Sequence, residues 1–455
     1  MQNSPRSSNH DWDASGNLIA DLARWSTSKV RNRIAASGLA TVFILFALVL
    51  LFIERAPPIV ALFAVILAAV AADFPKVRQT LTSSPVLWLS GMFVAWLLLS
   101  IGWSIAGTEA LNNGPRIALM ILAAVALPVL CLAQPTHVKE QAGRWAAYAS
   151  SLAVVLLLIE TLFDMPLLRT SRYMFNNEIF TDVLPIAAQR LEGVTYHANL
   201  YLANRLSHLA SIVAILLVPI SGYVFQRGSL PVAAATLIAG FVGLALAPTH
   251  TPLFAALVAL SFALVLVAAR GLQSRRSIAV LAMLAAGAIV LAPWLAQTLF
   301  ALSHGELAGS DVSIIHRFAI WDYAAGVVAE QPLIGSGIEA ARVLGREGVD
   351  FDQLVPGHPL NFEALPLHPH NAAIQIWLEL GGVGALMFAL FVVMMTRKAS
   401  EHSNEAISRA LLVAGWLSGI TIAHLSYGIW QYWWIASLGL VVAMMSLMFD
   451  PARQD

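Results

Sequence analysis

The stretch SIAVLAMLAAGAIVLAPWLAQTLFAL, residues 277–302, decides the fold class, because it contains no charged side chain over its whole length. Such a segment can cross roughly 30 Å of hydrocarbon as a helix, whereas the strands of a membrane barrel alternate in polarity over about ten residues. The whole chain of 455 residues shares this character, with 58% hydrophobic residues, 11% charged residues and a mean hydropathy of +0.74. The sequence therefore predicts an all-α, polytopic membrane protein.

Apolar segments of similar length recur along the chain, and we expect about twelve transmembrane helices. They lie near residues 35–54, 57–73, 86–105, 116–134, 144–163, 198–224, 230–248, 251–269, 277–302, 371–396, 407–427 and 430–449. The chain then divides into an N-terminal tail (1–33), nine helices (34–302) that include a smaller outer loop (164–197), a large and partly helical loop (303–370), three helices (371–449) and a C-terminal tail (450–455).

Lysine and arginine gather in the N-terminal tail and in alternate loops, which is the distribution typical of cytoplasmic segments. These residues are Arg6, Arg24, Lys29, Arg31 and Arg33 in the tail, and Lys76, Arg78, Lys139, Arg144, Arg227, Arg270, Arg275, Arg276, Arg397, Lys398 and Arg409 in the loops. We therefore expect both termini in the cytoplasm and the two long loops on the outer face of the membrane.

The second long loop contains RFAIWDYAAGVVAEQPLIGSG, residues 317–337. Phe318, Trp321 and Val328 recur there at helical intervals, which predicts a short amphipathic helix at the membrane surface. The proline and glycines of its last six residues then predict a turn.

The segment LPLHPHNAAIQIWLELGG, residues 365–382, places several polar side chains at the mouth of the tenth span. Asn371, Gln375 and Glu379 follow one another at four-residue steps, so they lie on one face of a helix. Polar groups are costly against lipid, so this face should point into the bundle interior and line a wet site. His370 would lie where that site meets the outer aqueous phase.

Four motifs in this order resemble the signature of the O-antigen ligase and polymerase superfamily. They are LLSIGWSIAGTEAL (98–111), RLEGVTYHANLYLA (190–203), Arg317 with Trp321 and PLIGSG (332–337), and HPHNAAIQIWLELGGVG (368–384). One position departs from the pattern, because PTHTP (248–252) has His250 where the family usually has an arginine. A side chain that titrates near pH 6.5 there replaces a permanently charged group.

The resemblance implies a membrane glycosyltransferase at the periplasmic face of the bacterial inner membrane. Such an enzyme moves a glycan from an undecaprenyl pyrophosphate carrier to the hydroxyl of an acceptor sugar. In an O-antigen ligase the acceptor is lipid A core, and in a polymerase it is the growing lipid-linked chain. We favour the ligase because the large outer loop lies late in the chain; transfer to a protein acceptor is a third alternative.

The residues can be assigned roles in that reaction. His370 is the candidate general base, because neutral imidazole accepts a proton near neutral pH. Arginine binds phosphate oxygens bidentately, so Arg317 and Arg190 are the first candidates for holding the pyrophosphate, followed by His250, Arg116 and Arg205. The supporting residues are Asn371, Gln375, Glu379, Trp321, His368 and Asn199.

Other classes of protein are less consistent with the sequence. No ligand spacing typical of a metal site and no phosphate-binding loop occurs, so we expect neither a metal nor another cofactor, and no nucleic-acid partner. The alternative to an enzyme is a twelve-span secondary transporter. The sequence argues against it, because the long polar loops lie on the outer face. In addition, the inner loop DFPKVRQTL (73–81) lacks the turn that is common in such transporters.

Overall fold

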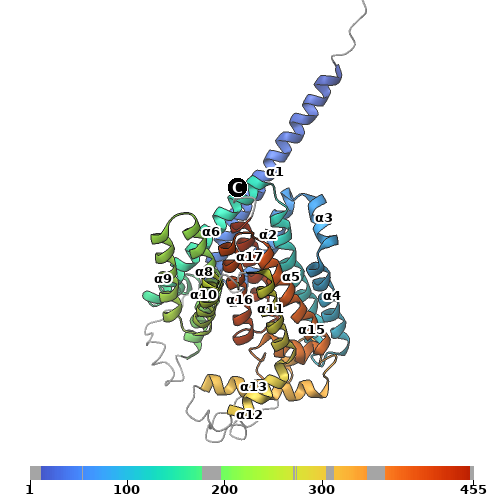
Figure 1. Ribbon diagram of the computed structural model, residues 1–455, viewed down its shortest axis with the longest axis vertical. Helices are drawn as coiled ribbons and strands as arrows, with labels where there is room; N and C mark the ends of the chain where they lie inside the picture. The colour runs from blue at the N-terminus through green and yellow to red at the C-terminus, as the bar shows by residue number, and fades with distance from the viewer. Residues whose placement is uncertain are drawn as a thin grey trace, which may run out of the picture.

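The computed structural model describes residues 12–53, 55–176, 196–269, 272, 274–303, 312–345 and 364–450. Within these ranges the secondary structure is helical, with no β-strand. Figure 1 shows a bundle of inclined helices with α13 (Val312–Glu330) lying across one end, and with the C-terminus at the other end. The prediction of an all-α, polytopic protein is confirmed.

Most bundle helices coincide with the apolar segments of the sequence. Their bounds are α1 (Trp12–Phe52), α2 (Ala56–Ala71), α3 (Phe74–Ser83), α4 (Pro85–Leu99), η1 (Ser100–Trp103), α5 (Thr108–Leu132), α6 (Thr136–Leu162), α7 (Pro166–Asn176), α8 (Tyr196–Gln226), α9 (Leu230–Leu246), α10 (Thr251–Ala268), α11 (Arg275–Val290), α12 (Ala292–Ser303), η4 (Ala340–Arg342), α15 (Ala372–Glu401), α16 (Ala406–Leu425) and α17 (Tyr432–Met448).

By the criteria of length and composition, the described residues account for fewer than twelve membrane spans. Among the described residues, eight helices can cross a membrane, or up to ten if the bent pairs α2–α3 and α11–α12 each form one span. The two other predicted spans correspond to α9 and α17, which are shorter apolar helices. The predicted count of twelve is therefore not confirmed.

The segment 277–302 is not one straight helix, as its composition suggested. It bends by 73° between α11 and α12. Pro293 explains the bend, because proline cannot donate to the carbonyl four residues earlier and its ring clashes with that carbonyl. That carbonyl belongs to Ile289, and it instead accepts a hydrogen bond from the indole of Trp377 at 3.0 Å.

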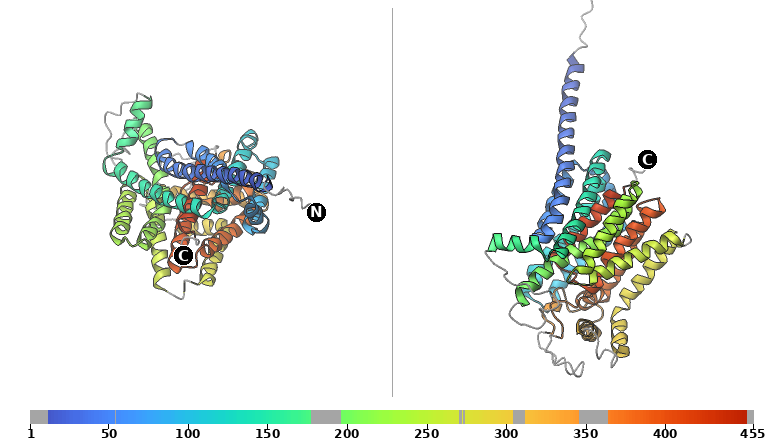
Figure 2. Two further views of the ribbon diagram at one scale, coloured as in Figure 1. Left: turned by 90° about the horizontal axis from the view of Figure 1, so that it is seen from above. Right: turned by 90° about the vertical axis from the view of Figure 1, so that its left-hand side faces the viewer.

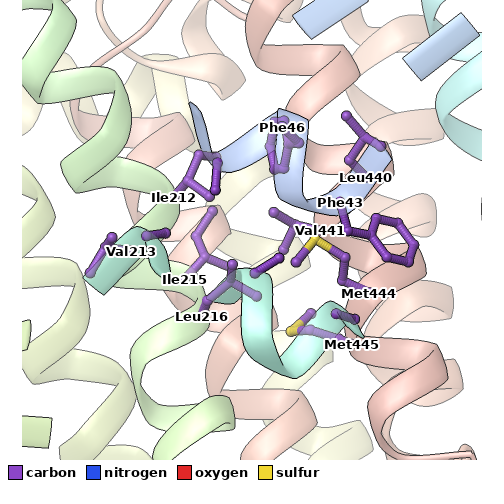
Figure 3. Close-up of a cluster of buried hydrophobic side chains, with 14 of the residues drawn as sticks. Phe43, Phe46, Ile212, Val213, Ile215, Leu216, Leu440, Val441, Met444 and Met445 are labelled. Carbon is purple, nitrogen blue, oxygen red and sulfur yellow. The ribbon is translucent and has the colours of Figure 1, made fainter. Parts of the chain in front are cut away.

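An apolar core joins the first, middle and last parts of the chain. Figure 3 shows Phe43 and Phe46 of α1 beside Ile215 of α8, with Leu440 and Met444 of α17. All five side chains are buried. This core fixes α17, and with it the turn between α16 and α17 that reaches the candidate site.

The loops that are rich in basic residues meet at the end of the bundle opposite α13. Lys139 forms a 2.7 Å salt bridge with Asp450 beside the C-terminus, and Arg275 donates to Asn404 at 3.1 Å. The long α1 also projects beyond the bundle at this end (Figure 2). The polar N-terminal tail expected at 1–33 is thus helical from Trp12 onward.

Helix α15 is interrupted at Gly381, and this break positions the candidate site. Gly381 has φ +64° and ψ −168°, which are not helical angles. The PLIGSG segment (332–337) fills the break: the amides of Ser336 and Gly337 donate to the carbonyls of Leu378 and Glu379, each at 2.8 Å. The loop thereby satisfies carbonyl groups that the broken helix leaves without intrahelical partners.

The motif at 98–111 packs on the other side of the same loop. The hydroxyl of Ser104 donates to the carbonyl of Ile338 at 2.6 Å, and the hydroxyl of Ser100 accepts from the Ile338 amide at 3.2 Å. The approach is so close that a Cβ on Gly337 would lie 2.2 Å from the Cα of Ser104. Three motifs that are far apart in the sequence therefore converge around one break in α15.

Replacing Gly337 with alanine should destabilise the protein by at least about 2 kcal/mol, because its φ of +86° disfavours any side chain and the Ser104 backbone cannot yield. Gly326→Ala in α13 is the matched control, since a Cβ there meets no atom within 4 Å. The thermal midpoint in detergent, followed by fluorescence-detected size exclusion, measures the effect. Equal midpoints for both variants would contradict the proposed role of the loop.

Candidate active site

His370 lies at the α13 end of the bundle, just before α15. Its ring Nδ1 is 2.5 Å from the carbonyl oxygen of Ser426, which belongs to the turn between α16 and α17. A carbonyl can only accept a hydrogen bond, so Nδ1 carries the proton and the lone pair of the neutral ring is on Nε2. The backbone has φ +53°, a left-handed conformation that is uncommon for residues other than glycine and often found at functional sites.

The surroundings of His370 favour its neutral form. Burial lowers the pKa of the ring below the usual 6.5, and the positive charges of Arg317 and His316 lower it further, against the hydrogen bond to Ser426. The side chain is nevertheless only partly buried. A neutral imidazole with its Nδ1 proton held in place can accept a proton through Nε2.

Helix α13 brings Arg317 toward His370. The indole of Trp321 donates to the carbonyl of Pro369 at 2.8 Å, which anchors α13 one residue before His370. Arg317 is one turn earlier on the same helix face, because residues four apart share a face. The structure thus contains the helix that the spacing of Phe318, Trp321 and Val328 predicted, with Val328 buried in the core beneath it.

His368 lies next to His370, and the surrounding protein holds its ring in place. The two ring centroids are 4.3 Å apart, and Nδ1 of His368 accepts from the backbone amide of His370 at 3.3 Å. Burial, followed by electrostatic interactions with His370 and Arg342, lowers the pKa of His368 to about 3. The ring also lies against Gly428, where a Cβ would approach it to 2.8 Å. These contacts hold the HPH segment against the turn between α16 and α17.

On the polar face of α15, two of the three predicted side chains are buried against protein groups. Asn371 caps the helix, its side-chain oxygen accepting from the amides of Ala373 and Ile374 at 3.0 and 3.2 Å. Gln375 and Glu379 point into the bundle and are 3% and 0% exposed. The expectation of a water-lined stripe is therefore wrong for these two side chains, because the surrounding loops satisfy their polar atoms.

Glu379 joins three segments of the chain. Its Oε2 accepts from the backbone amide of Glu339 at 2.6 Å and from the indole of Trp430 at 2.8 Å. Its Oε1 accepts from Gln375 at 3.1 Å, and Gln375 in turn accepts from the amide of Ile429 at 3.0 Å. One buried carboxyl group thus connects α15, the loop after α13 and the turn between α16 and α17.

The turn Ser426–Gln431 contains residues that contact the candidate site and that the sequence patterns did not single out. It supplies the carbonyl that orients His370, the amide that binds Gln375 and the indole that binds Glu379. Burial raises the pKa of Tyr427 to about 12, and the Tyr427 hydroxyl donates to the Ser207 carbonyl of α8 at 3.1 Å. The run SYGIWQY, residues 426–432, combines a glycine with aromatic and amide side chains, which was the available signal.

Arg116 belongs to a polar cluster on one side of this turn. Tyr432 donates to Asn113 at 2.9 Å and is also hydrogen-bonded to Arg116. Asn113 donates to the carboxylate of Glu339 at 2.9 Å, and Arg342 pairs with the same carboxylate at 2.5 Å. Arg342 was not among the residues predicted from the sequence, although its charge reaches His368.

Arg205 and His250 lie on the other side of the turn. Arg205 is 5% exposed on α8, one turn before His208, whose ring stacks on Trp433 at 3.7 Å between centroids. The turn before α10 is tied to the same helix, because Thr249 donates to Ser207 at 3.1 Å, and His250 itself is exposed. Arg190 lies outside the described residues, and the side chain of Asn199 is likewise not described.

An apolar cavity of about 300 Å³ adjoins the site at the bend between α11 and α12. Trp321 and Asn371 form its wall nearest His370, and His424 of α16 lies on another wall. Most of the other lining residues are alanine, leucine and isoleucine. Among the described residues, no group of three or more histidine, cysteine or acidic side chains could hold a metal ion.

Comparison with known proteins relates this arrangement to a family. Residues 234–389 match the family model described as O-antigen ligase. Proteins named "putative polysaccharide ligase" are similar over part of the chain: 34% identity over 142 residues in Rickettsia conorii, 35% over 142 in Rickettsia bellii and 32% over 139 in Rickettsia felis. Each alignment covers 30% of this chain and 33% of the relative. The chain therefore matches about a third of the length of each relative. The resemblance to the O-antigen ligase superfamily is confirmed.

Removal of the buried carboxyl group should loosen the whole site. Glu379→Ala leaves the Glu339 amide, the Trp430 indole and the Gln375 amide without an acceptor, so we expect a loss of about 3 kcal/mol or more in stability. Glu401→Ala is the control, because this residue of α15 forms only an exposed pair with Arg397. The thermal midpoint and proteolysis of the loop after α13 report the difference; unchanged values for Glu379→Ala would refute the assigned connection.

Proposed function

We propose that this O-antigen ligase-like protein transfers a glycan from undecaprenyl pyrophosphate to a sugar hydroxyl of lipid A core. The observation that carries the proposal is the pairing of a neutral, oriented imidazole with a guanidinium: His370 is fixed through Nδ1 on Ser426, and the charge of Arg317 reaches it. The family match and the ligase-named relatives support the same class of chemistry.

The proposed reaction is a single displacement at the anomeric carbon. Nε2 of His370 takes the proton of the acceptor hydroxyl while its oxygen attacks that carbon. The bond between the anomeric carbon and the pyrophosphate oxygen breaks, and its electron pair leaves on the lipid pyrophosphate. Arg317 binds the phosphate oxygens and stabilises the charge that develops on them. The configuration at the anomeric carbon would be inverted.

The surroundings also suit a lipid-linked donor. The apolar cavity of about 300 Å³ at Trp321 and Asn371 can receive the first isoprenoid units next to the pyrophosphate. The basic loops lie at the opposite end of the bundle, where Lys139 and Arg275 make their contacts. By the positive-inside rule that end would be cytoplasmic, with both termini, and the site would face the periplasm from the inner membrane.

His370→Ala should lower the transfer rate by about 10²- to 10⁴-fold, which is the usual contribution of a general base. The assay uses purified protein in nanodiscs with preformed lipid-linked glycan, and it offers lipid A core and a second lipid-linked glycan as competing acceptors. His137→Ala, an exposed histidine at the basic end, is the matched control. Near-normal transfer by His370→Ala would eliminate the base assignment. Elongation of the lipid-linked glycan alone would indicate a polymerase.

The acidic limb of the pH profile tests the charge next to His370. Burial and the Arg317 charge lower the pKa of His370, so the base stays deprotonated at neutral pH and activity should fall only below about 6.5. Arg317→Gln removes a positive charge, which raises that pKa and moves the acidic limb of kcat/KM to higher pH. Arg317→Lys keeps the charge and should leave the limb in place, while the rate falls about tenfold or more because lysine cannot form the bidentate contact. The same acidic limb in the unmodified protein and in both variants would mean that Arg317 does not act on His370.

A further inference from the structure

A second, larger cavity runs inside the bundle from the candidate site, and it shares Ile420 and His424 with the first cavity. Its volume is about 580 Å³, and it lies between α4 and α5 on one side and α15, α16 and α17 on the other. Phe93, Val125, Phe388 and Leu438 are typical of its predominantly apolar wall. Such a wall offers a water molecule few hydrogen-bonding partners, so the space suits a hydrocarbon chain.

The two ends of the cavity differ in polarity. Near the candidate site it is lined by Phe93 and Trp430, whereas at the basic end of the bundle it is lined by Thr80, Ser84 and Lys398. These ends are about 14 Å apart along α4, from the nine residues between Ser84 and Phe93 at 1.5 Å each. The space is therefore elongated along the bundle, and the one lysine in its lining, Lys398, lies at the basic end.

The polar end is suited to an anionic group. Lys398 is exposed, and the lining residues of the cavity include no aspartate or glutamate in the described part of the chain. Helix α4 begins at this end, but α3 ends there too, with Ser84 as the cap residue of both, so the positive end of one helix dipole meets the negative end of the other. The charge that favours a negatively charged partner here is therefore the Lys398 ammonium.

We propose that this cavity binds one acyl chain of an anionic phospholipid, whose phosphate lies between Lys398 and the start of α4. The lipid would come from the leaflet at the basic end of the bundle. The glycan donor does not fit this arrangement, because its pyrophosphate is proposed to lie at Arg317. Lys398 is 17 residues after the break at Gly381, or about 25 Å along α15, on the side away from His370.

The bound lipid would also contact the candidate site from inside the bundle. Its chain would end against Trp430, whose indole donates to Glu379 at 2.8 Å. A chain in the cavity would add van der Waals contacts to that indole, which already lies beside Phe93 with 6.2 Å between ring centroids. Lipid occupancy is therefore expected to raise the thermal midpoint of the protein.

Native mass spectrometry of the detergent-solubilised protein tests the proposal. With phosphatidylglycerol and phosphatidylethanolamine supplied at equal concentration, we expect one phosphatidylglycerol molecule to be retained preferentially. Lys398→Ala should weaken its retention about fivefold, which corresponds to about 1 kcal/mol for one basic residue at the membrane surface. Arg397→Ala is the control, since Arg397 is paired with Glu401 and does not line the cavity.

A cavity-filling variant provides the second arm. Val125 lines the cavity, and Val125→Phe should abolish retention of the lipid. Leu122 lies one turn earlier on α5, is 48% exposed and does not line the cavity, so Leu122→Phe should not affect retention. Equal retention of both phospholipids, or retention unchanged in Lys398→Ala and Val125→Phe, would overturn the proposal. So would a retained polyprenyl phosphate in place of the phospholipid. These outcomes are read from lipid retention and the transfer assay is read from product formation, so the two proposals can fail separately.

Discussion

A buried carboxyl group in an apolar bundle is the constraint on which the site depends. Glu379 has no exposed surface, and a polar group without partners in such surroundings costs several kcal/mol. Its oxygens must therefore be satisfied by other parts of the protein. The amide of Glu339 and the indole of Trp430 do so, which ties the loop after α13 and the turn after α16 to the middle of α15.

The break in α15 likewise creates backbone groups that other parts of the protein must satisfy. Gly381 releases carbonyl groups that a continuous helix would have used, and the amides of Ser336 and Gly337 take them up. The same loop binds Ser100 and Ser104 on its other side. Because these segments are fixed relative to one another, Ser426 can orient His370. The polar interactions inside the bundle thus fix His370 near Arg317 at its end, where we propose a general base and a phosphate-binding cation.

Much of the fold could be predicted because hydrophobicity and spacing are local properties. Composition alone indicated an all-α membrane protein, and the spacing of Phe318, Trp321 and Val328 indicated α13. The bend between α11 and α12 was missed although Pro293 signalled it, since the apolar run around it masks the break. The count of twelve spans was not confirmed because α9 and α17 are shorter apolar helices.

The site was less predictable, because its geometry comes from contacts between distant segments. The spacing of Gln375 and Glu379 indicated one inward face, but not that loops would satisfy both side chains in place of water. Most of the turn at Ser426–Gln431 was assigned to the two flanking spans, 407–427 and 430–449. Arg342 stands in no recognisable sequence pattern. No local pattern states which carbonyl will meet the ring of His370.

The central claim is that an imidazole and a guanidinium from distant segments act on one lipid pyrophosphate. Electron cryomicroscopy of the protein in nanodiscs with a non-transferable lipid pyrophosphate glycan tests it most directly. The account predicts phosphate oxygens within about 3 Å of the Arg317 guanidinium and the anomeric carbon facing Nε2 of His370. Phosphate density at Arg116 and Arg342 alone, with the His370 ring turned toward lipid, would contradict it.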